Sequence, residues 1–420
     1  MGKVRVSKEN KKAIGKIKLS GSKSISNRVL IIRALCNEDF EIANLSDSDD
    51  TRTLEQLLSS DAYELDAHHA GTTFRFLTSY LAVSEGEKVL TGSDRMQERP
   101  IKALSDALID MGADITYLKN EGYPPLKIGS PLRKLKSSIE LSASISSQYI
   151  SSLLLIAPTL PDGLEIHLEG DIVSRPYLEM TLKIMEYFGV EHTWEGKTIA
   201  VKAQEYKARD FYVEADWSAA SYYYILAALA DDVDLTLEGL QHDSLQGDSA
   251  ITEIGKSFGI QTSFNGREIR LTKSENPASE YFEYDFIQCP DIAQSVSTMA
   301  AGLGTSVLFS GLQTLRIKET DRIAALQNEL SKIQVFLSQL PQKFSKNSGV
   351  EYFLQEGKAA SGEETPTFLT YKDHRMAMAF GPLALLFPIE VEEHMVVTKS
   401  YPEYWNDFKS LGYQIEETGM

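Results

Sequence analysis

Helix-period segments recur along the chain, and a glycine follows most of them. In one of them the apolar residues Ile101, Leu104, Leu108 and Met111 fall three or four positions apart, which is the spacing of one helix face. Glycine after such a segment suits the left-handed C-terminus of a helix. Segments with this pattern occupy residues 48–60, 99–115, 175–192, 246–262, 320–336 and 401–415.

The closing positions are evenly spaced. They are Gly112, Gly189, Gly259 and Gly412, with Gln334 in the fourth place, so one follows another after 70 to 78 residues. This period exceeds that of most solenoid repeats. It predicts six copies of a small α/β subdomain, the copy at 48–60 being shortened. The alternative is coincidence, because any α/β chain offers helix–glycine–strand segments.

Alternating or β-branched runs between the helices predict strands. They are KVRVS at 3–7, LEIHLEG at 164–170, VDLTLEGL at 233–240 and MVVTKS at 395–400. The chain therefore is predicted to be α/β throughout. We expect two globular halves with a ligand cleft between them, a common place for a small-molecule site.

The composition of the chain excludes several classes of function. Of 420 residues, 42 are Lys or Arg and 60 are Asp or Glu, giving a net charge of −18. Such a chain is a poor partner for nucleic acid or an anionic membrane, because both require neutralisation of phosphates. Two cysteines exclude a disulfide scaffold. The polar N-terminus and the short apolar run at 376–389, which holds two prolines, predict a cytoplasmic protein.

Polar residues gather where helices are expected to begin. Backbone N–H groups at a helix start favour anions, although serines are also ordinary helix caps and lysines are common on loop surfaces. The residues in question are Lys23, Arg28, Gly71, Arg75, Arg99, Ser146, Ser147, Gln148, Ser174, Arg175 and Tyr177.

Two charged clusters are denser. Residues 316–322 contain Arg316, Lys318, Glu319, Asp321 and Arg322. The triplet 373–375, Asp-His-Arg, precedes what reads as a long apolar helix, and a third basic position is Lys399. Exposed salt bridges would explain one such cluster. Several together favour a binding site for a small anion.

The motifs, in their order, are similar to those of the 5-enolpyruvylshikimate-3-phosphate synthase family. They are GSKSISNR, AGTTFR, GSDRMQERP, SSQ, SRPY, RIKETDR, DHRMAM and TKSYPEYW, within residues 16–408. The resemblance implies a two-domain enolpyruvyl transferase fold, an inside-out α/β barrel of six βαβαββ repeats with the first shortened. It implies one domain of residues 1–20 plus 216–420 on the phosphoenolpyruvate and carboxylate side. Residues 21–215 would form the shikimate 3-phosphate side, with the active site in the cleft between the domains.

The resemblance also implies residue roles. The phosphoenolpyruvate site would comprise Lys23, Gly71, Arg99, Gln148, Arg322, Arg375 and Lys399. The shikimate 3-phosphate site would comprise Lys23, Ser24, Arg28, Ser146, Ser147, Gln148, Ser174, Tyr177, Asp291 and Lys318. The catalytic residues would be Asp291, Glu319, Lys23 and Lys318.

The implied reaction transfers the enolpyruvyl group of phosphoenolpyruvate to the 5-hydroxyl of shikimate 3-phosphate, a step of aromatic amino acid biosynthesis. It needs proton-transferring carboxylates and cations around phosphate. No metal or cofactor is expected, because Lys and Arg can supply the charge. The implied protein is a monomer whose partners are these two substrates.

Three positions depart from the family's usual residues. His68-His69 replaces Gly-Asn before Gly71, and Thr314 replaces Asn before residue 315. One alternative is another enolpyruvyl transferase of the same fold, which acts on a UDP-sugar through a loop cysteine. Neither Cys36 nor Cys289 lies where that cysteine is expected. A second alternative is an inactive binding protein descended from the enzyme.

Overall fold

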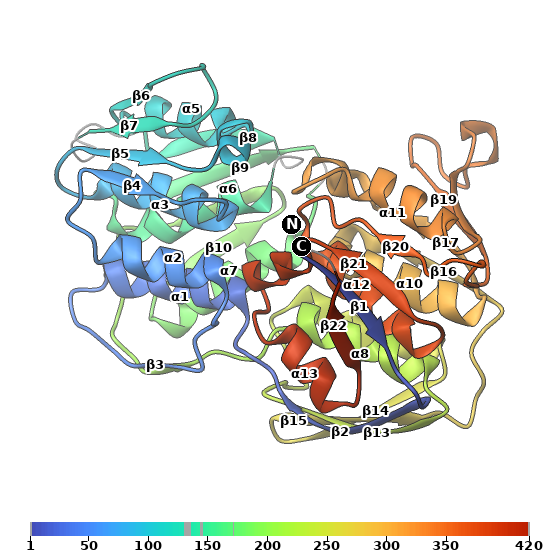
Figure 1. Ribbon diagram of the computed structural model, residues 1–420. Helices are drawn as coiled ribbons and strands as arrows, with labels where there is room; N and C mark the ends of the chain where they lie inside the picture. The colour runs from blue at the N-terminus through green and yellow to red at the C-terminus, as the bar shows by residue number, and fades with distance from the viewer. Residues whose placement is uncertain (1, 130–135, 143–145, 171, 419–420) are drawn as a thin grey trace. The chain divides into compact units, whose positions relative to one another are not determined.

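The computed structural model describes residues 2–129, 136–142, 146–170 and 172–418. The chain divides into two compact units. Unit 1 is Met1–Ser20 with Glu214–Met420, and unit 2 is Gly21–Val213. For comparison, the sequence predicted domains of 1–20 with 216–420 and of 21–215. Each unit is described separately below (Figure 1).

Unit 1 contains three four-stranded sheets. Each sheet joins two parallel strands to an antiparallel pair. In the first two sheets the order of the strands, counted along the chain, is first, second, fourth, third, whereas in the third sheet the antiparallel pair comes from the two ends of the chain. The first sheet is β2 (Lys12–Lys18), β13 (Asp232–Glu238), β15 (Glu268–Lys273) and β14 (Ile260–Asn265). The second is β16 (Tyr281–Asp285), β17 (Ser306–Ser310), β19 (Phe353–Gly357) and β18 (Val335–Gln339). The third is β20 (Thr367–Phe368), β21 (Ile389–Glu392), β1 (Lys3–Ser7) and β22 (Gln414–Glu417).

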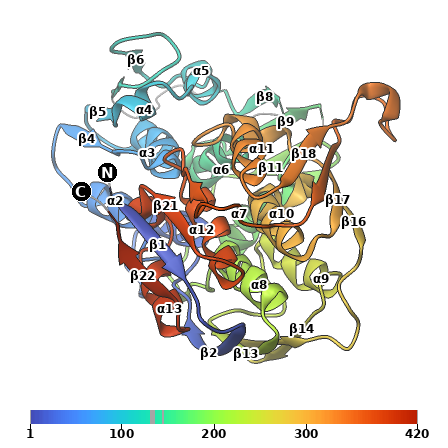
Figure 2. The same cartoon turned by 45° about the vertical axis from the view of Figure 1, so that its right-hand side comes forward.

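Helices accompany each sheet of unit 1. The helices before the second strands are α8 (Trp217–Leu229), α10 (Ala293–Leu303) and α12 (His374–Phe380). The helices after the second strands are α9 (Ile251–Lys256), α11 (Arg322–Ser331) and α13 (Tyr404–Ser410). Helices α8, α10 and α12 contact one another. Every residue of α8 from Ala219 to Leu229 is buried, as expected for a helix that is apolar all round. Figure 2 shows β2, β13 and β14 beside α8 at the edge of the unit.

Unit 2 repeats this plan twice in full. The first sheet is β4 (Glu64–Asp66), β5 (Lys88–Thr91), β7 (Leu126–Ile128) and β6 (Ile115–Tyr117), with helices α3 (Gly71–Val83), α4 (Asp94–Gln97) and α5 (Lys102–Asp110). The second is β8 (Ser138–Ser142), β9 (Leu164–Glu169), β11 (Thr198–Val201) and β10 (His192–Glu195), with helices α6 (Ser147–Ile156) and α7 (Arg175–Tyr187).

The remaining copy in unit 2, which comes first along the chain, is shorter than the others, as the sequence predicted. Its sheet has two parallel strands among the described residues, β12 (Phe211–Tyr212) and β3 (Ile42–Ala43). Its helices are α1 (Lys23–Leu35) and α2 (Asp49–Leu58), and α1 contacts α3 and α6. The six predicted βαβαββ repeats are therefore confirmed, with helices inside each unit and with no hairpin in one copy among the residues that the structure describes.

The positions that close the second helices adopt the left-handed conformation. The φ angles are 103° at Gly112, 83° at Gly189, 75° at Gly259 and 87° at Gly412. Gln334 adopts a φ of 63° in the same role. The regular spacing of these residues therefore reflects one backbone turn that each repeat makes.

Three local predictions were wrong. Residues 395–400 are not a strand, because His394–Lys399 forms a 3-10 turn, and turn geometry here overrides the β-propensity of its valines. The apolar helix after Asp373 is short, since α12 ends at Phe380 and Pro382 lacks the N–H that a continued helix needs. Arg99 does not lie directly at a helix start, because α5 begins three residues later, at Lys102.

Candidate active site

Most of the predicted site residues of unit 1 lie at or just before the N-termini of helices. Asp291 is in the 3-10 turn Pro290–Ile292 that leads into α10. Lys318 and Glu319 precede α11, which begins at Arg322. Asp373 caps α12 by accepting a hydrogen bond of 2.9 Å from the backbone N–H of Arg375. Because free N–H groups and the helix dipole make these ends positive, they stabilise carboxylates and anionic ligands.

Arg322 is the centre of this cluster. Its guanidinium donates to Asp373 at 2.7 and 3.2 Å, to Asp291 at 3.0 Å and to Glu319 at 3.0 Å. Its side chain is only 2% exposed. Burial by itself lowers the pKa of Arg322, but the three carboxylates outweigh burial and raise this pKa above its ordinary value. Arg322 is therefore a permanent cation that fixes three acidic groups.

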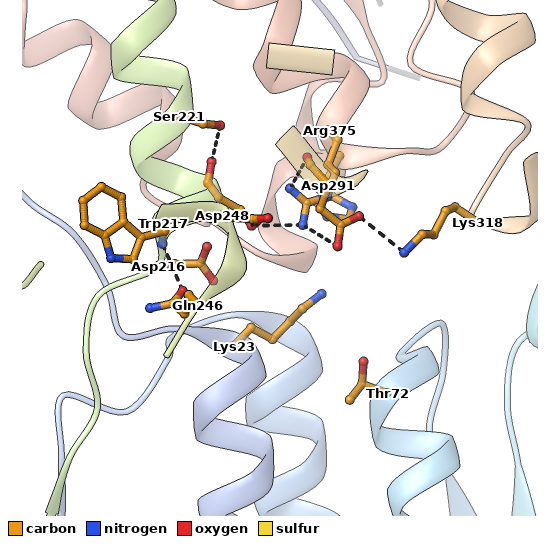
Figure 3. A network of polar contacts seen from close by, with 12 residues as sticks. Lys23, Thr72, Asp216, Trp217, Ser221, Gln246, Asp248, Asp291, Lys318 and Arg375 are labelled. Atoms are coloured by element: carbon orange, nitrogen blue, oxygen red, sulfur yellow. Dashed lines mark hydrogen bonds and ion pairs between the residues drawn. The ribbon is translucent and has the colours of Figure 1, made fainter. Parts of the chain in front are cut away.

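Asp291 is held by cations on both carboxylate oxygens. Lys318 Nζ lies 3.4 Å from Oδ1, the oxygen that also accepts from Arg322, and Arg375 Nη2 lies 3.5 Å from Oδ2. Arg375 Nη1 also donates to the backbone carbonyl of Asp291 at 3.0 Å. Figure 3 shows Asp291 between Lys318 and Arg375. The carboxylate is thus rigidly placed and can accept a proton from a bound hydroxyl group.

Lys318 differs from Arg322 in the direction of its pKa shift. Its pKa is lowered from the ordinary value by burial, and the nearby carboxylate of Asp291 opposes this shift only in part. A lysine with a lowered pKa can bind an anion as a cation and can also release its proton more readily than an exposed lysine.

Glu319 is held by a second pair of cations. Lys399 Nζ donates to its Oε1 at 2.6 Å, and Arg322 donates to its Oε2. Lys399 is 6% exposed and comes from the 3-10 turn that replaces the predicted strand. The two segments that the sequence singled out, 316–322 and 398–405, therefore meet in one ion pair.

Unit 2 has its own group of residues at helix N-termini. Lys23 is the first residue of α1, and its Nζ lies 3.3 Å from Oδ2 of Asp50 in α2. Ser146 caps α6, where its hydroxyl accepts from the backbone N–H of Gln148, and Ser147 is the first residue of that helix. Ser174, with a φ of 55°, precedes α7.

Gly71, the first residue of α3, lies against two guanidinium groups. A Cβ atom at this position would lie 2.6 Å from Nη1 of Arg99 and 2.8 Å from Nη1 of Arg75. Arg75 donates to Oε1 of Gln148 at 2.8 Å, and Gln148 Nε2 donates to Thr72 at 3.1 Å. Glycine therefore permits two cations and an oriented amide to approach one helix start.

Arg28 is placed differently from the other predicted ligands. Its guanidinium donates to Thr181 at 2.7 Å, to Ser151 at 3.1 Å and to the carbonyls of Ser24 and Tyr177 at 2.7 and 3.3 Å. It is buried, and burial lowers its pKa to about 10. These contacts join α1, α6 and α7, so Arg28 holds the helices that present Ser24 and Tyr177.

The structure adds four residues to which the sequence analysis assigned no role in substrate binding or catalysis. Asp50 faces Lys23, Asp373 faces Arg322, Arg75 orients Gln148, and Asp248 is buried behind Arg375. Asp373 and Arg75 lie within motifs that were singled out, so a signal was present. Asp50 and Asp248 lie outside those motifs.

His68 and Thr314, which depart from the family pattern, do not belong to the residue clusters described above. His68 is exposed and lies 3.1 Å from Asp66, while the hydroxyl of Thr314 has no hydrogen-bond partner in the described residues. In the described parts of the chain, no group of three or more His, Cys, Asp or Glu side chains could hold a metal ion. Nor does any helix there have the length and apolar character needed to cross a membrane.

The chain is similar to known proteins over nearly its whole length. The chain matches the family described as EPSP synthase (3-phosphoshikimate 1-carboxyvinyltransferase) over residues 8–60 and 54–408. A 3-phosphoshikimate 1-carboxyvinyltransferase of Bacteroides fragilis strain YCH46 is 44% identical over 403 residues, covering 95% of this chain and 96% of the relative. One of Aliivibrio fischeri strain MJ11 is 35% identical, covering 94% and 96%.

Solved structures show the same fold. An EPSP synthase of Acinetobacter baumannii superposes with a TM-score of 0.78 at 21% identity, covering all of both chains. The enolpyruvyl transferase NikO of Streptomyces tendae gives a TM-score of 0.74 at 13% identity, covering 99% of each chain.

Proposed function

Since this chain belongs to the EPSP synthase (3-phosphoshikimate 1-carboxyvinyltransferase) family, we propose that its two groups of helix-start residues act together on phosphoenolpyruvate and shikimate 3-phosphate. The enzyme is a transferase of the shikimate pathway, and it moves the enolpyruvyl group to the 5-hydroxyl of the acceptor. The proposal concerns which residues bind each substrate and which move protons.

The observation that carries the proposal is the cation-held pair of carboxylates, Asp291 and Glu319. In the addition step, the 5-hydroxyl oxygen bonds to C2 of phosphoenolpyruvate and loses its proton to Asp291. The methylene carbon gains a proton from the Glu319 side, which gives a tetrahedral intermediate. In the elimination step, the new methyl group returns a proton to Glu319, the C–O bond to phosphate breaks, and the leaving phosphate takes up the proton held by Asp291.

Cations take the remaining charge. In unit 1, Lys399 and Arg375 would bind the carboxylate and phosphate of phosphoenolpyruvate. In unit 2, Lys23 and Arg99 would do the same, beside the helix start at Gly71. Arg322 would act mainly by fixing Asp291 and Glu319, because its guanidinium is already shared among three carboxylates. Pre-placed cations stabilise the leaving phosphate without reorganisation during the reaction.

Shikimate 3-phosphate would be bound by serines and cations of both units. Its phosphate would contact Ser146, Ser147 and Ser174, with Gln148 and Tyr177 beside it. Lys318 would bind the acceptor near its 5-hydroxyl and assist Asp291. Ser24 and Lys23 would complete the set, with Arg28 supporting the helices behind them.

A phosphate-release assay tests the activity. The purified protein, after exhaustive chelation of metals, should release phosphate from phosphoenolpyruvate only when shikimate 3-phosphate is present. A requirement for a divalent metal, or turnover with a UDP-sugar acceptor instead, would contradict the proposal. An inert protein that still binds both substrates would support the binding-protein alternative.

A binding titration tests whether both units serve one acceptor. Lys23→Ala in unit 2 and Lys318→Met in unit 1 should each weaken shikimate 3-phosphate by about tenfold or more, because each removes a charged contact. If either variant binds as the unaltered protein does, that residue is not part of the acceptor site.

We further propose that the enzyme is a monomer in the cytoplasm, where its two free thiols, Cys36 and Cys289, would stay reduced.

A further inference from the structure

Asp248 is a buried carboxyl group for which the proposed mechanism has no use. It lies in the 3-10 turn Gly247–Ala250 before α9 and is 4% exposed. Its Oδ2 accepts a hydrogen bond from the hydroxyl of Ser218, and its Oδ1 has no hydrogen-bond partner among the described residues. A buried carboxyl group that is only half satisfied is costly, so its presence calls for an explanation.

Ser218 connects this carboxyl group to the candidate site. Ser218 is the second residue of α8, and Arg375 Nη2 donates to its hydroxyl oxygen at 3.2 Å. A serine hydroxyl has one proton, so donation to Asp248 turns the oxygen lone pairs toward Arg375. Arg375 in turn donates to the carbonyl of Asp291. Figure 3 shows Asp248, Arg375 and Asp291 in this order.

We propose that Asp248 is a positioning residue, which acts through Ser218 to fix the guanidinium of Arg375 for phosphoenolpyruvate binding. The proposal rests on the proposed function, in which Arg375 binds that substrate and Asp291 accepts the hydroxyl proton. Without the Asp248 acceptor, the Ser218 hydroxyl can rotate and donate elsewhere. Arg375 then loses the hydrogen bond from its Nη2 to Ser218, which helps to hold that nitrogen beside Asp291.

The charge of Asp248 gives the arrangement a pH dependence. Burial, with the negative charge of Asp291, raises the pKa of Asp248 to about 7, and Arg375 and Ser218 oppose this shift. The carboxyl group also interacts electrostatically with Asp216 and with the thiol of Cys289. Below about pH 7 Asp248 is neutral and leaves the positive charge of Arg375 to the substrate. Above it, the ionised carboxyl group competes for that charge, so the KM for phosphoenolpyruvate should rise.

Four variants and a control test this role. Asp248→Ala and Ser218→Ala should each raise the KM for phosphoenolpyruvate about tenfold, the usual effect of losing a hydrogen bond to a charged group. The KM for shikimate 3-phosphate should change less. The double variant should be no worse than either single one, because both act through one connection. The near-isosteric Asp248→Asn should retain the KM seen at pH 6 and lose its rise above pH 7.

The control is Glu329→Gln, which alters another fully buried carboxylate of unit 1 that binds Lys332 and the backbone N–H of Leu369. It should lower the melting temperature without changing the KM for phosphoenolpyruvate. Unchanged KM values in the Asp248 and Ser218 variants, additive effects, or an unaltered pH profile in Asp248→Asn would overturn the inference while the unaltered enzyme stays active. Absence of product from the unaltered enzyme would instead overturn the proposed function, and this inference with it.

Discussion

Lys399 Nζ donates a hydrogen bond of 2.6 Å to Oε1 of Glu319, although 80 positions separate the two residues in the chain. Glu319 also accepts from Arg322, so both of its oxygens face cations. The contact places a carboxylate and a phosphate-binding cation of the proposed mechanism within one hydrogen bond of each other. Anionic substrates that bind Lys399 would therefore meet the group proposed to exchange protons with them.

Replacing Glu319 by Gln should separate catalysis from binding. Glutamine keeps the size and the hydrogen-bond acceptor but removes the exchangeable proton. We expect kcat to fall by about 10²- to 10⁴-fold, the usual contribution of a positioned acid–base group, with KM values little changed. Steady-state kinetics with both substrates would measure this.

Two further variants serve as controls for Glu319→Gln. Glu363→Gln removes an exposed charge of unit 1 and should leave kcat unchanged. Lys318→Met should damage both shikimate 3-phosphate binding and turnover. Near-normal turnover in Glu319→Gln would reduce Glu319 to a structural ion-pair partner and exclude it from proton transfer.

Gly71→Ala should alter the phosphoenolpyruvate side of the site. The added methyl group would overlap the guanidinium groups of Arg99 and Arg75, which must move because a contact of 2.6 Å is too short. We expect weaker binding of phosphoenolpyruvate and a larger loss for glyphosate, a bulkier phosphonate mimic of that substrate. Inhibition constants and KM values on the folded variant measure both effects.

The matched control for Gly71 is Gly362→Ala, because a Cβ atom at Gly362 meets nothing within 4 Å. This variant should behave as the unaltered protein does. If Gly71→Ala weakened both ligands equally and also lowered the melting temperature, the glycine would serve only the helix start.

The lowered pKa of Lys318 predicts how acceptor binding depends on pH. Burial favours the neutral amine, so Lys318 loses its charge at a lower pH than an exposed lysine does. Affinity for shikimate 3-phosphate should therefore fall as pH rises toward the ordinary lysine range. In Lys318→Arg this fall should move to higher pH, because a guanidinium stays charged. An identical pH dependence in both proteins would assign the fall to another group.

Gln334→Gly should stabilise the protein. Gln334 adopts a φ of 63° where four other repeats have glycine, and this conformation costs a non-glycine residue about 1 kcal/mol. The urea midpoint of unit 1 unfolding should rise in the variant. Gln339→Gly, in the exposed part of β18, should lower it instead, because glycine weakens a strand. A decrease for Gln334→Gly would show that the side chain contributes more than the backbone strain costs.

The repeats could be predicted from the sequence because they depend on local signals. Leu104 and Leu108 mark one buried helix face, and Gly112 marks where that helix ends. The spacing alone predicted that a helix ends at Gln334, because glutamine by itself does not indicate a left-handed turn. The short distance to the next repeat predicted that the copy containing β3 is shortened, and the sheet of that copy has two strands among the described residues.

Features that depend on distant parts of the chain could not be predicted. The valines at 396 and 397 favour a strand, yet the segment turns and brings Lys399 to Glu319. The role of Arg322 in holding three carboxylates depends on residues up to 51 positions away. Asp248 lies in a helix start like many others, and only its burial behind Ser218 distinguishes it.

Product analysis in heavy water tests the central claim most directly, since addition and elimination must protonate and then deprotonate the methylene carbon of phosphoenolpyruvate. Mass spectrometry of a reaction run in D₂O should show enolpyruvylshikimate 3-phosphate with deuterium in its vinyl group, and Glu319→Gln should slow deuterium uptake and product formation together. Product without deuterium would contradict the addition–elimination mechanism, and no product from the unaltered protein would contradict the proposed function itself.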